Sequence, residues 1–196
     1  MSSVRPGPLI VVAGPSGVGK TTVIAEVLRV CEFPLRRGVT ATTRGPRPGE
    51  TPGSDYHYWS EEQFVRAIAA GEMLEHALVY GTDHYGTPMS EVAPHRAAGT
   101  GVMLVIDVQG AAQVRDRLGR EVVSVFLTPP SLEVLEARLR LRGTDAPDRI
   151  RRRLETARAE LARAGEFDHV IENADVAAAT RQLLGVIRDQ FPPREG

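Results

Sequence analysis

The stretch LIVVAGPSGVGKTTVI, residues 9–24, contains the pattern that decides the fold. The continuous apolar run over residues 8–15 is closed by Gly-Pro, which is typical of a β-strand that is buried on both faces. Residues 20–30 then have the spacing of a helix with one apolar side. That side would consist of Val23, Val27 and Val30. We therefore expect a strand, a glycine-rich turn and a helix in direct succession.

The same alternation of strand and helix continues along the chain. Further strands are expected in the apolar runs 101–110, 121–130 and 169–173. The first of these would end at Asp107 and lead into the helical pattern of residues 111–118. Ser131 and Asp175 would be the N-caps of the two later helices. Strands that alternate with helices predict an α/β fold, in which a parallel sheet has helices on both faces.

Two segments interrupt this alternation. Residues 38–90 are rich in Thr, Gly, Pro, Arg and Tyr, and we expect them to form an inserted subdomain of mixed strands with one helix near residues 60–70. Residues 138–154 are rich in arginine and contain a Gly-Thr-Asp break between two helical patterns.

Composition limits the classes of protein that this chain can represent. A length of 196 residues suits one compact domain, and the net charge of −1 argues against a general nucleic-acid-binding protein. The single cysteine, Cys31, excludes an internal disulfide and fits a reducing compartment. No apolar run reaches the roughly 18 residues of a membrane span, and the first residues lack a signal-peptide pattern. We expect a cytoplasmic protein that binds neither nucleic acid nor membrane.

The turn after the first strand matches the phosphate-loop motif G-x-x-x-x-G-K-[ST], with Lys20 as the only lysine of the chain. Glycines let the backbone N–H groups face phosphate oxygens, and the following helix N-terminus adds a positive field. A compact ammonium suits the β- and γ-phosphates, and the Thr21 hydroxyl could bind Mg²⁺. The alternative is an ordinary turn with a solvent-facing lysine. We assign to the triphosphate Gly14, Ser16, Gly17, Val18, Gly19, Lys20, Thr21 and Thr22.

The acceptor of the phosphate must be sought in the inserted segment. Arg44 and Arg47 are three residues apart in a loop stiffened by prolines, and Tyr56 follows shortly after. Two guanidinium groups and a tyrosine hydroxyl can share one phosphate dianion. A solvated loop with unrelated arginines is the alternative.

Five segments after the phosphate loop, in this order, resemble the guanylate kinases: TTRGPRPGE, EMLEHA, HYGTP, IDVQG and RLRLRGTD. The resemblance extends from about residue 9 to residue 190. It implies transfer of the γ-phosphoryl group of ATP to GMP, with Mg²⁺ as the cofactor. It also implies a single domain with a core, a GMP-binding insert and a mobile lid. These parts would be the core 8–37, 91–137 and 155–191, the insert 38–90 and the lid 138–154.

The resemblance assigns roles to individual residues of the insert. The GMP phosphate would be bound by Arg44, Arg47, Tyr56 and Tyr85. Glu75 would read guanine, and Thr40 and Thr87 would contact the base through their hydroxyls. Guanine presents N1–H and N2–H₂ to a carboxylate, whereas adenine presents a lone pair at N1, so we expect strong discrimination. Asp107 would contact GMP or orient Mg²⁺ through water.

In the lid, the resemblance implies that Arg142 and Arg153 close on the triphosphate, with Arg138 one helical turn before Arg142. Asn173 matches a position near the adenine of ATP. Because phosphoryl transfer depends on cations around the developing charge, the catalytic residues would be Lys20, Arg44, Arg142 and Arg153.

Three departures from the family pattern bear on base specificity. Thr40 replaces the usual serine, Val105 replaces the first acid of the D/E-x-D segment, and the loop between Glu75 and Tyr85 is one residue longer. The alternative enzyme is a kinase of a sugar phosphate such as ribose 1,5-bisphosphate. A non-catalytic phosphopeptide-binding module is a third hypothesis, which the intact Lys20 and Thr21 oppose. The sequence leaves the oligomeric state open.

Overall fold

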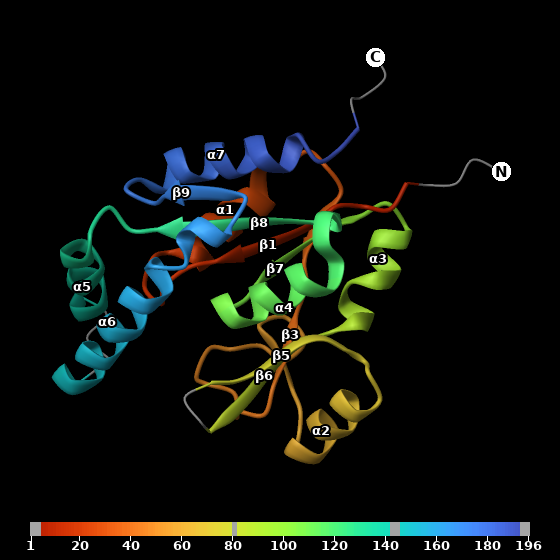
Figure 1. Ribbon diagram of the computed structural model, residues 1–196, viewed down its shortest axis with the longest axis horizontal. Coiled ribbons are helices and arrows are strands. Elements are labelled where there is room, and N and C mark those ends of the chain that lie inside the picture. The colour runs from red at the N-terminus through yellow and green to blue at the C-terminus, as the bar shows by residue number, and fades with distance from the viewer. Residues whose placement is uncertain (1–4, 80–81, 142–145, 193–196) are drawn as a thin grey trace. The chain divides into compact units, whose positions relative to one another are not determined.

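The computed structural model describes residues 5–79, 82–141 and 146–192 (Figure 1). The chain divides into two compact units. The first unit comprises Met1–Leu9, Pro34–Leu104 and Gln109–Val122. The second unit comprises Ile10–Phe33, Val105–Val108 and Val123–Gly196. Each unit is therefore assembled from segments that lie far apart in the sequence.

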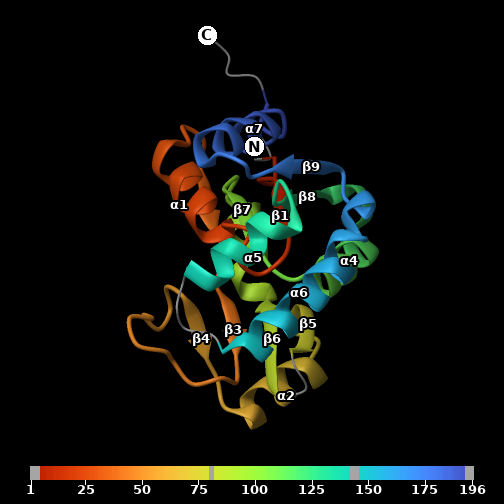
Figure 2. The ribbon, with the colours of Figure 1, turned by 90° about the vertical axis from the view of Figure 1, so that its left-hand side faces the viewer.

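The second unit carries three strands in the order β1-β8-β9, of which β8 and β9 pair in parallel. The strands are β1 (Leu9–Ala13), β8 (Val122–Thr128) and β9 (His169–Glu172). The helices are α1 (Lys20–Val30), α5 (Leu132–Leu141), α6 (Pro147–Leu161) and α7 (Val176–Arg188). Helix α1 packs against α7, and α5 packs against α6 (Figure 2).

The local sequence explains the elements of the second unit. All five residues of β1 are apolar and buried, as expected for a central strand. The predicted helix is confirmed; Val23 and Val27 on its apolar side are buried, whereas Val30 is 37% exposed. Val30 is the last helical residue, and the buried face of α1 ends at Val27.

The predicted N-caps are present in the second unit. The Ser131 hydroxyl accepts from Val134 N at 3.3 Å before α5, and the Asp175 carboxylate accepts from Ala178 N at 2.8 Å before α7. Each side chain satisfies a backbone donor that has no partner within the helix.

The first unit contains two sets of paired strands. Strand β2 (Leu35–Arg37) pairs in parallel with β7 (Gly101–Val105). A four-stranded mixed sheet has the order β4-β3-β6-β5. Its strands are β3 (Thr40–Thr42), β4 (Tyr56–Tyr58), β5 (Met73–Val79) and β6 (Asp83–Pro88). The helices are α2 (Glu61–Ala69), α3 (Ala93–Ala97) and α4 (Val108–Leu118).

Helix α2 packs on the mixed sheet, and residues of the helix and of the strands together form a small apolar core. Ser60 and Gln63 form a reciprocal capping box at the start of the helix, with N···O distances of 2.8 and 3.1 Å. Phe64 is fully buried against Ala41 of β3 and Met73 of β5. The helix therefore ties two strands of this sheet together, which keeps the side chains on β3 and β5 in fixed positions.

The predicted α/β class, with a parallel sheet flanked by helices and a mixed insert, is confirmed. The expectation that a strand ends at Asp107 is wrong, because β7 ends at Val105 and α4 already begins at Val108. Asp107 lies in the short connection between them. The sequence also did not predict β2 and α3, which have three and five residues and are too short to show a periodic pattern. The core, insert and lid boundaries stay predictions.

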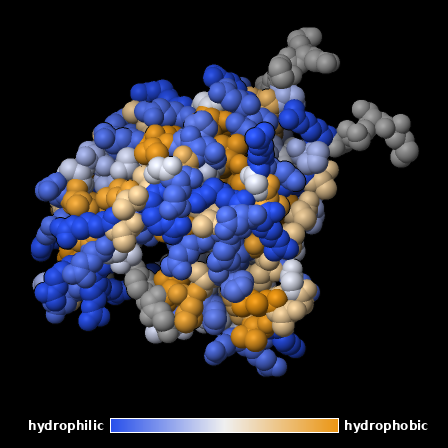
Figure 3. All heavy atoms as spheres, viewed as in Figure 1, coloured by the Kyte–Doolittle hydropathy of each residue, from blue (hydrophilic) through white to orange (hydrophobic). Residues whose placement is uncertain are grey.

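Within the described residues, no helix has the length and apolar character needed to cross a membrane. The face shown in Figure 3 is mainly hydrophilic, and apolar residues are scattered over it in small groups.

Candidate active site

The loop between β1 and α1 has glycine at both ends. Gly14 has φ +143°, and a Cβ there would lie 2.2 Å from the Leu127 carbonyl oxygen of β8. Gly19 precedes α1 with φ +102°, and a Cβ there would lie 2.5 Å from Asn173 Nδ2. Both contacts are too close for any side chain, and both φ values disfavour L-residues. The loop can therefore take this path only with glycine at both ends.

Lys20, the first residue of α1, folds back over this loop. Its Nζ donates to Gly14 O at 2.5 Å and to Pro15 O at 3.1 Å. These two bonds hold the ammonium against the loop that precedes it. A flexible stem with three donors can make both bonds, whereas a planar guanidinium is less suited to this geometry.

The carbonyl of Val18 is the second point at which the loop is held. It accepts from Asn173 Nδ2 at 2.7 Å and from Arg138 Nη1 at 3.1 Å. Arg138 Nη2 also donates to the Asn173 carbonyl at 2.9 Å. Both residues were predicted to contact ATP, and both contact the loop backbone. Asn173 is 2% exposed, and its Oδ1 has no hydrogen-bond partner among the described residues.

Oxygen donors for a divalent cation lie in the same unit. Thr21 and Thr22 are exposed in the first turn of α1, and Asp107 is half-buried. A hydroxyl and a carboxylate are hard oxygen ligands of the kind that Mg²⁺ prefers, so the residues present fit this ion. Among the described residues, no group of three or more His, Cys, Asp and Glu forms a protein-only metal site.

Glu160 of α6 is a charged residue of this unit that the sequence did not indicate. The pKa of its carboxyl group is raised above the ordinary value, and burial is the main cause. The Lys20 ammonium opposes this shift, and the Asp107 carboxylate adds to it. Glu160 is thus electrostatically linked to two predicted site residues. In the sequence it lies in an arginine-rich helical pattern, which is equally typical of a solvated helix face. Arg153 is half-buried on the same helix, whereas Arg142 lies outside the described residues.

In the first unit, Arg44 is held among several predicted ligands of the GMP phosphate. Its Nε donates to the Tyr85 hydroxyl at 2.9 Å, and its guanidinium lies 5.4 Å from the centre of the Tyr56 ring. The Tyr56 and Tyr85 rings meet edge to face, with their centres 5.8 Å apart. The structure thus brings these three residues together, while the side chain of Arg47 is exposed.

Glu50 holds Arg44 in this cluster, and no sequence motif indicated this residue. Its carboxylate accepts two hydrogen bonds from Arg44, at 2.9 and 3.0 Å, one from the Tyr58 hydroxyl at 2.7 Å and one from Arg47 N at 2.8 Å. The Arg44 guanidinium, opposed by burial and helped by the Arg47 N–H and the Tyr58 hydroxyl, lowers the pKa of Glu50 to about 2. The same pair raises the pKa of Arg44. A glutamate that ends a Pro-Gly loop gives no sequence signal of these contacts.

The predicted guanine-reading residues also lie together. Glu75 on β5 is 4% exposed, and its Oε1 accepts from the Thr87 hydroxyl at 2.7 Å. The two residues face each other in the β5–β6 ladder. Thr40 is half-buried on β3, where it pairs with Tyr56 of β4. The longer loop before Tyr85 includes residues 80–81, which lie outside the described residues.

The sequence model of the guanylate kinase family matches residues 7–190. The chain belongs to the guanylate kinase family. The guanylate kinase of Bifidobacterium longum is 48% identical over 188 residues, which cover 94% of this chain and 95% of that protein. The guanylate kinase of Gloeobacter violaceus is also 48% identical, over 94% of this chain and 88% of that protein.

Comparison of structures agrees with the sequence relationship. The crystal structure of guanylate kinase from Anaplasma phagocytophilum superimposes with a TM-score of 0.79 at 30% identity. The superposition covers 96% of this chain and 88% of that chain. The fold of this guanylate kinase family member is therefore matched over nearly its whole length.

We predict that Glu50→Gln weakens the fold in a pH-dependent manner. The pKa of Glu50 is depressed from 4.5 to about 2, so its charged form stabilises the folded protein above pH 4.5. This contribution is lost as the pH falls through about 2. The difference in free energy of unfolding between wild type and variant, measured with denaturant at a series of pH values, should be largest above pH 4.5 and shrink toward pH 2.

The exposed Glu155 of α6 provides a control with the same loss of charge. Glu155→Gln should change the free energy of unfolding by less than about 0.5 kcal/mol. A difference for Glu50→Gln that stays constant between pH 5 and pH 2 would contradict the assignment.

Proposed function

We propose that this chain is a guanylate kinase that transfers the γ-phosphoryl group of ATP to GMP and releases ADP and GDP. The observation that carries the proposal is the arrangement of β6, which places Tyr85 in the Arg44 cluster and Thr87 against Glu75. Strand β6 thus carries Tyr85, which contacts Arg44, and two positions later Thr87, which donates to the buried Glu75 carboxylate. Such an arrangement suits a nucleoside monophosphate, which has a base at one end and a phosphate at the other.

The phosphate loop is the proposed site of the ATP triphosphate. Backbone N–H groups of the loop and the N-terminus of α1 would bind the β- and γ-phosphates. Lys20 would exchange its bonds to the Gly14 and Pro15 carbonyls for bonds to phosphate oxygens. Arg138 and Asn173, which hold the Val18 carbonyl, would keep the loop in shape while this happens.

Thr21 and Asp107 are the proposed residues that hold Mg²⁺, Thr21 directly and Asp107 through water. When bound, the ion would neutralise charge on the β- and γ-phosphates.

The Arg44 cluster is the proposed site of the GMP phosphate. Arg44, Arg47, Tyr56 and Tyr85 would bind its oxygens. Glu50 already takes two of the guanidinium bonds of Arg44, so its role would be to hold that group in one orientation. The Tyr85 hydroxyl, which accepts from Arg44, retains its own proton for the ligand.

Glu75 is the proposed reader of guanine. Its carboxylate would accept from N1–H and N2–H₂ of the base. The single proton of Thr87 is used to donate to Glu75, so Thr87 would orient the carboxylate in addition to contacting the base. Adenine would place its N1 lone pair against the carboxylate and leave buried groups unpaired. Thr40, on the neighbouring strand β3, is the proposed second hydroxyl contact to the base.

In the proposed reaction, an oxygen of the GMP phosphate attacks the γ-phosphorus in line with the bond that breaks. The bond from the γ-phosphorus to the β–γ bridging oxygen is cleaved, and its electrons remain on ADP. Lys20, Arg44 and the lid arginines Arg142 and Arg153 would stabilise the charge that develops on the transferred group. A lid over residues 138–154 would exclude water, which would otherwise accept the phosphoryl group.

The proposal is tested by coupling ADP release to a spectrophotometric assay with GMP, dGMP, AMP and ribose 1,5-bisphosphate as acceptors. We expect turnover with GMP and dGMP and almost none with the other two. Similar rates with AMP, or turnover with ribose 1,5-bisphosphate alone, would contradict the proposal. The curated relatives named above favour guanylate kinase over the sugar phosphate kinase.

We predict that Glu75→Gln lowers the discrimination between GMP and AMP. The glutamine amide keeps one acceptor for guanine, but its NH₂ group faces the second guanine donor and cannot bind it. With adenine, the same NH₂ group can donate to N1. The ratio of kcat/KM for GMP to that for AMP should fall by roughly 100-fold. The exposed Glu72, just before β5, gives the control Glu72→Gln, which should leave the ratio unchanged. An unchanged ratio in Glu75→Gln would remove Glu75 from base recognition.

A further inference from the structure

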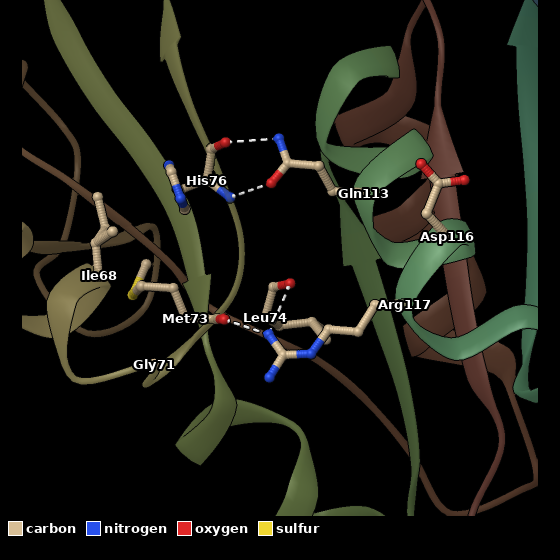
Figure 4. A pocket seen from close by; sticks show the side chains of 8 residues that line it. All are labelled: Ile68, Gly71, Met73, Leu74, His76, Gln113, Asp116 and Arg117. Atoms are coloured by element: carbon tan, nitrogen blue, oxygen red, sulfur yellow. Dashed lines mark hydrogen bonds between the residues drawn. The ribbon is translucent and has the colours of Figure 1, made fainter.

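The outer edge of β5 is held by the side chain of Gln113 from α4. Strand β5 is the last strand of its sheet, so in the part of the chain that the structure describes one edge of its backbone has no neighbouring strand. The Gln113 amide takes that place at His76, where Oε1 accepts from His76 N at 3.1 Å and Nε2 donates to His76 O at 2.7 Å (Figure 4). The backbone donor and acceptor of His76 fix the orientation of the amide.

Arg117 makes a second attachment one helical turn further along α4. Its Nη1 donates to Met73 O at 2.7 Å and approaches Leu74 O at 3.4 Å (Figure 4). Residues four apart lie on the same face of a helix and about 6 Å apart along its axis. Leu74 and His76 are two residues apart, about 6.6 Å in a regular strand, whereas Met73, which accepts the shorter bond, is three residues from His76. The two side chains of α4 therefore contact two separate points on the edge of β5.

A β-bulge lies at the point that Arg117 contacts. Met73 pairs with Pro88 and Glu75 pairs with Thr87, so Leu74 is an extra residue on β5. A bulge changes the direction of the side chains that follow it and interrupts the ladder. Arg117 supplies a donor to backbone carbonyls at the bulge, and Gln113 binds the backbone of His76, directly after Glu75.

Glu75 is thus fixed by contacts on both sides of it along the strand. Its own ladder partner is Thr87, and its side chain is buried against the hydroxyl of that residue. A shift of the bulge would move the carboxylate relative to Thr87, because both lie in the same ladder. The position of the carboxylate therefore depends on the two attachments to α4.

We propose that Gln113 and Arg117 are positioning residues that set the guanine-reading carboxylate of Glu75 by holding the edge of β5 at His76 and at the Met73–Leu74 bulge. The proposal rests on the proposed function. Neither residue would touch GMP. They would act on the recognition of the base and leave the binding of ATP unchanged.

The same contacts line a pocket of about 500 Å³ between α4, β5 and the end of α2 (Figure 4). Asp116 also lines this pocket, and its carboxylate makes no hydrogen bond or ion pair among the described residues. Asp116 therefore offers a control on the same helix and in the same pocket.

The test uses Gln113→Glu, which keeps the size and shape of the side chain. Near neutral pH the carboxylate still accepts from His76 N but repels the His76 carbonyl. We expect KM and Kd for GMP to rise roughly tenfold, while KM for ATP and kcat at saturating GMP change less than about twofold. Protonation restores a donor for the His76 carbonyl, so the difference from wild type in Kd for GMP should shrink toward pH 5.

Two further measurements separate positioning from a general effect on stability. Asp116→Asn should leave Kd for GMP and KM for ATP unchanged. Hydrogen exchange of the β5 amides, measured without nucleotide, should accelerate in Gln113→Ala and not in Asp116→Asn. An unchanged Kd for GMP in Gln113→Glu would overturn the proposal. So would equal effects on GMP and ATP, or a Kd difference that does not shrink as the pH falls.

The outcome can be distinguished from a failure of the proposed function. If wild type did not phosphorylate or bind GMP, the proposed function would fail, and the role in guanine recognition would fail with it. If wild type used GMP normally but Gln113→Glu bound it equally well, only the positioning role would be overturned.

Discussion

A loop that turns its backbone N–H groups toward a phosphate directs carbonyl groups the other way, and these carbonyls need donors. In this protein the Gly14 and Pro15 carbonyls accept from Lys20, and the Val18 carbonyl accepts from Asn173 and Arg138. A buried carbonyl without a partner costs about 1–3 kcal/mol, so these bonds stabilise the loop when no nucleotide is bound. Two further elements therefore help to hold the loop. Helix α5 carries Arg138, and strand β9 ends just before Asn173.

In the first unit, side chains also hold groups that would otherwise lack a fixed position or a hydrogen-bond partner. Arg44 would move freely on its flexible stem, but Glu50 and Tyr85 hold its guanidinium from two sides. The edge of β5 would expose unpaired backbone groups, but Gln113 supplies a donor and an acceptor. In both cases a group that would otherwise have to be ordered on ligand binding is fixed in advance, which lowers the entropic cost of recognition.

The sequence predicted those parts of the fold that local patterns encode. The strand, turn and helix of residues 9–30 follow from an apolar run, required glycines and helical spacing, and the caps Ser131 and Asp175 follow from their position before a helix. Short elements such as β2 and α3 have no such pattern. The end of β7 was also misplaced, because Ile106 continues the apolar run as far as Asp107 without continuing the strand.

The candidate site residues were predicted from motifs, whereas the motifs did not indicate the residues that contact and hold them. Arg44, Tyr56 and Tyr85 lie together, as do Glu75 and Thr87. Glu50 and Gln113 were missed because their main partners are an arginine six residues away across a turn and a backbone edge 37 residues away. Such contacts are set by tertiary structure. The sequence also did not indicate that the Asn173 amide nitrogen donates to the Val18 carbonyl of the loop.

Following the fate of a radioactive γ-phosphoryl group is the most direct test of transfer from ATP to GMP. The protein would be incubated with ATP labelled at the γ-position and with GMP, and the products would be separated by chromatography. We expect the label as the terminal phosphate of GDP, in equal amount to the ADP formed. Label found only in inorganic phosphate, or retained on the protein, would contradict direct transfer to GMP.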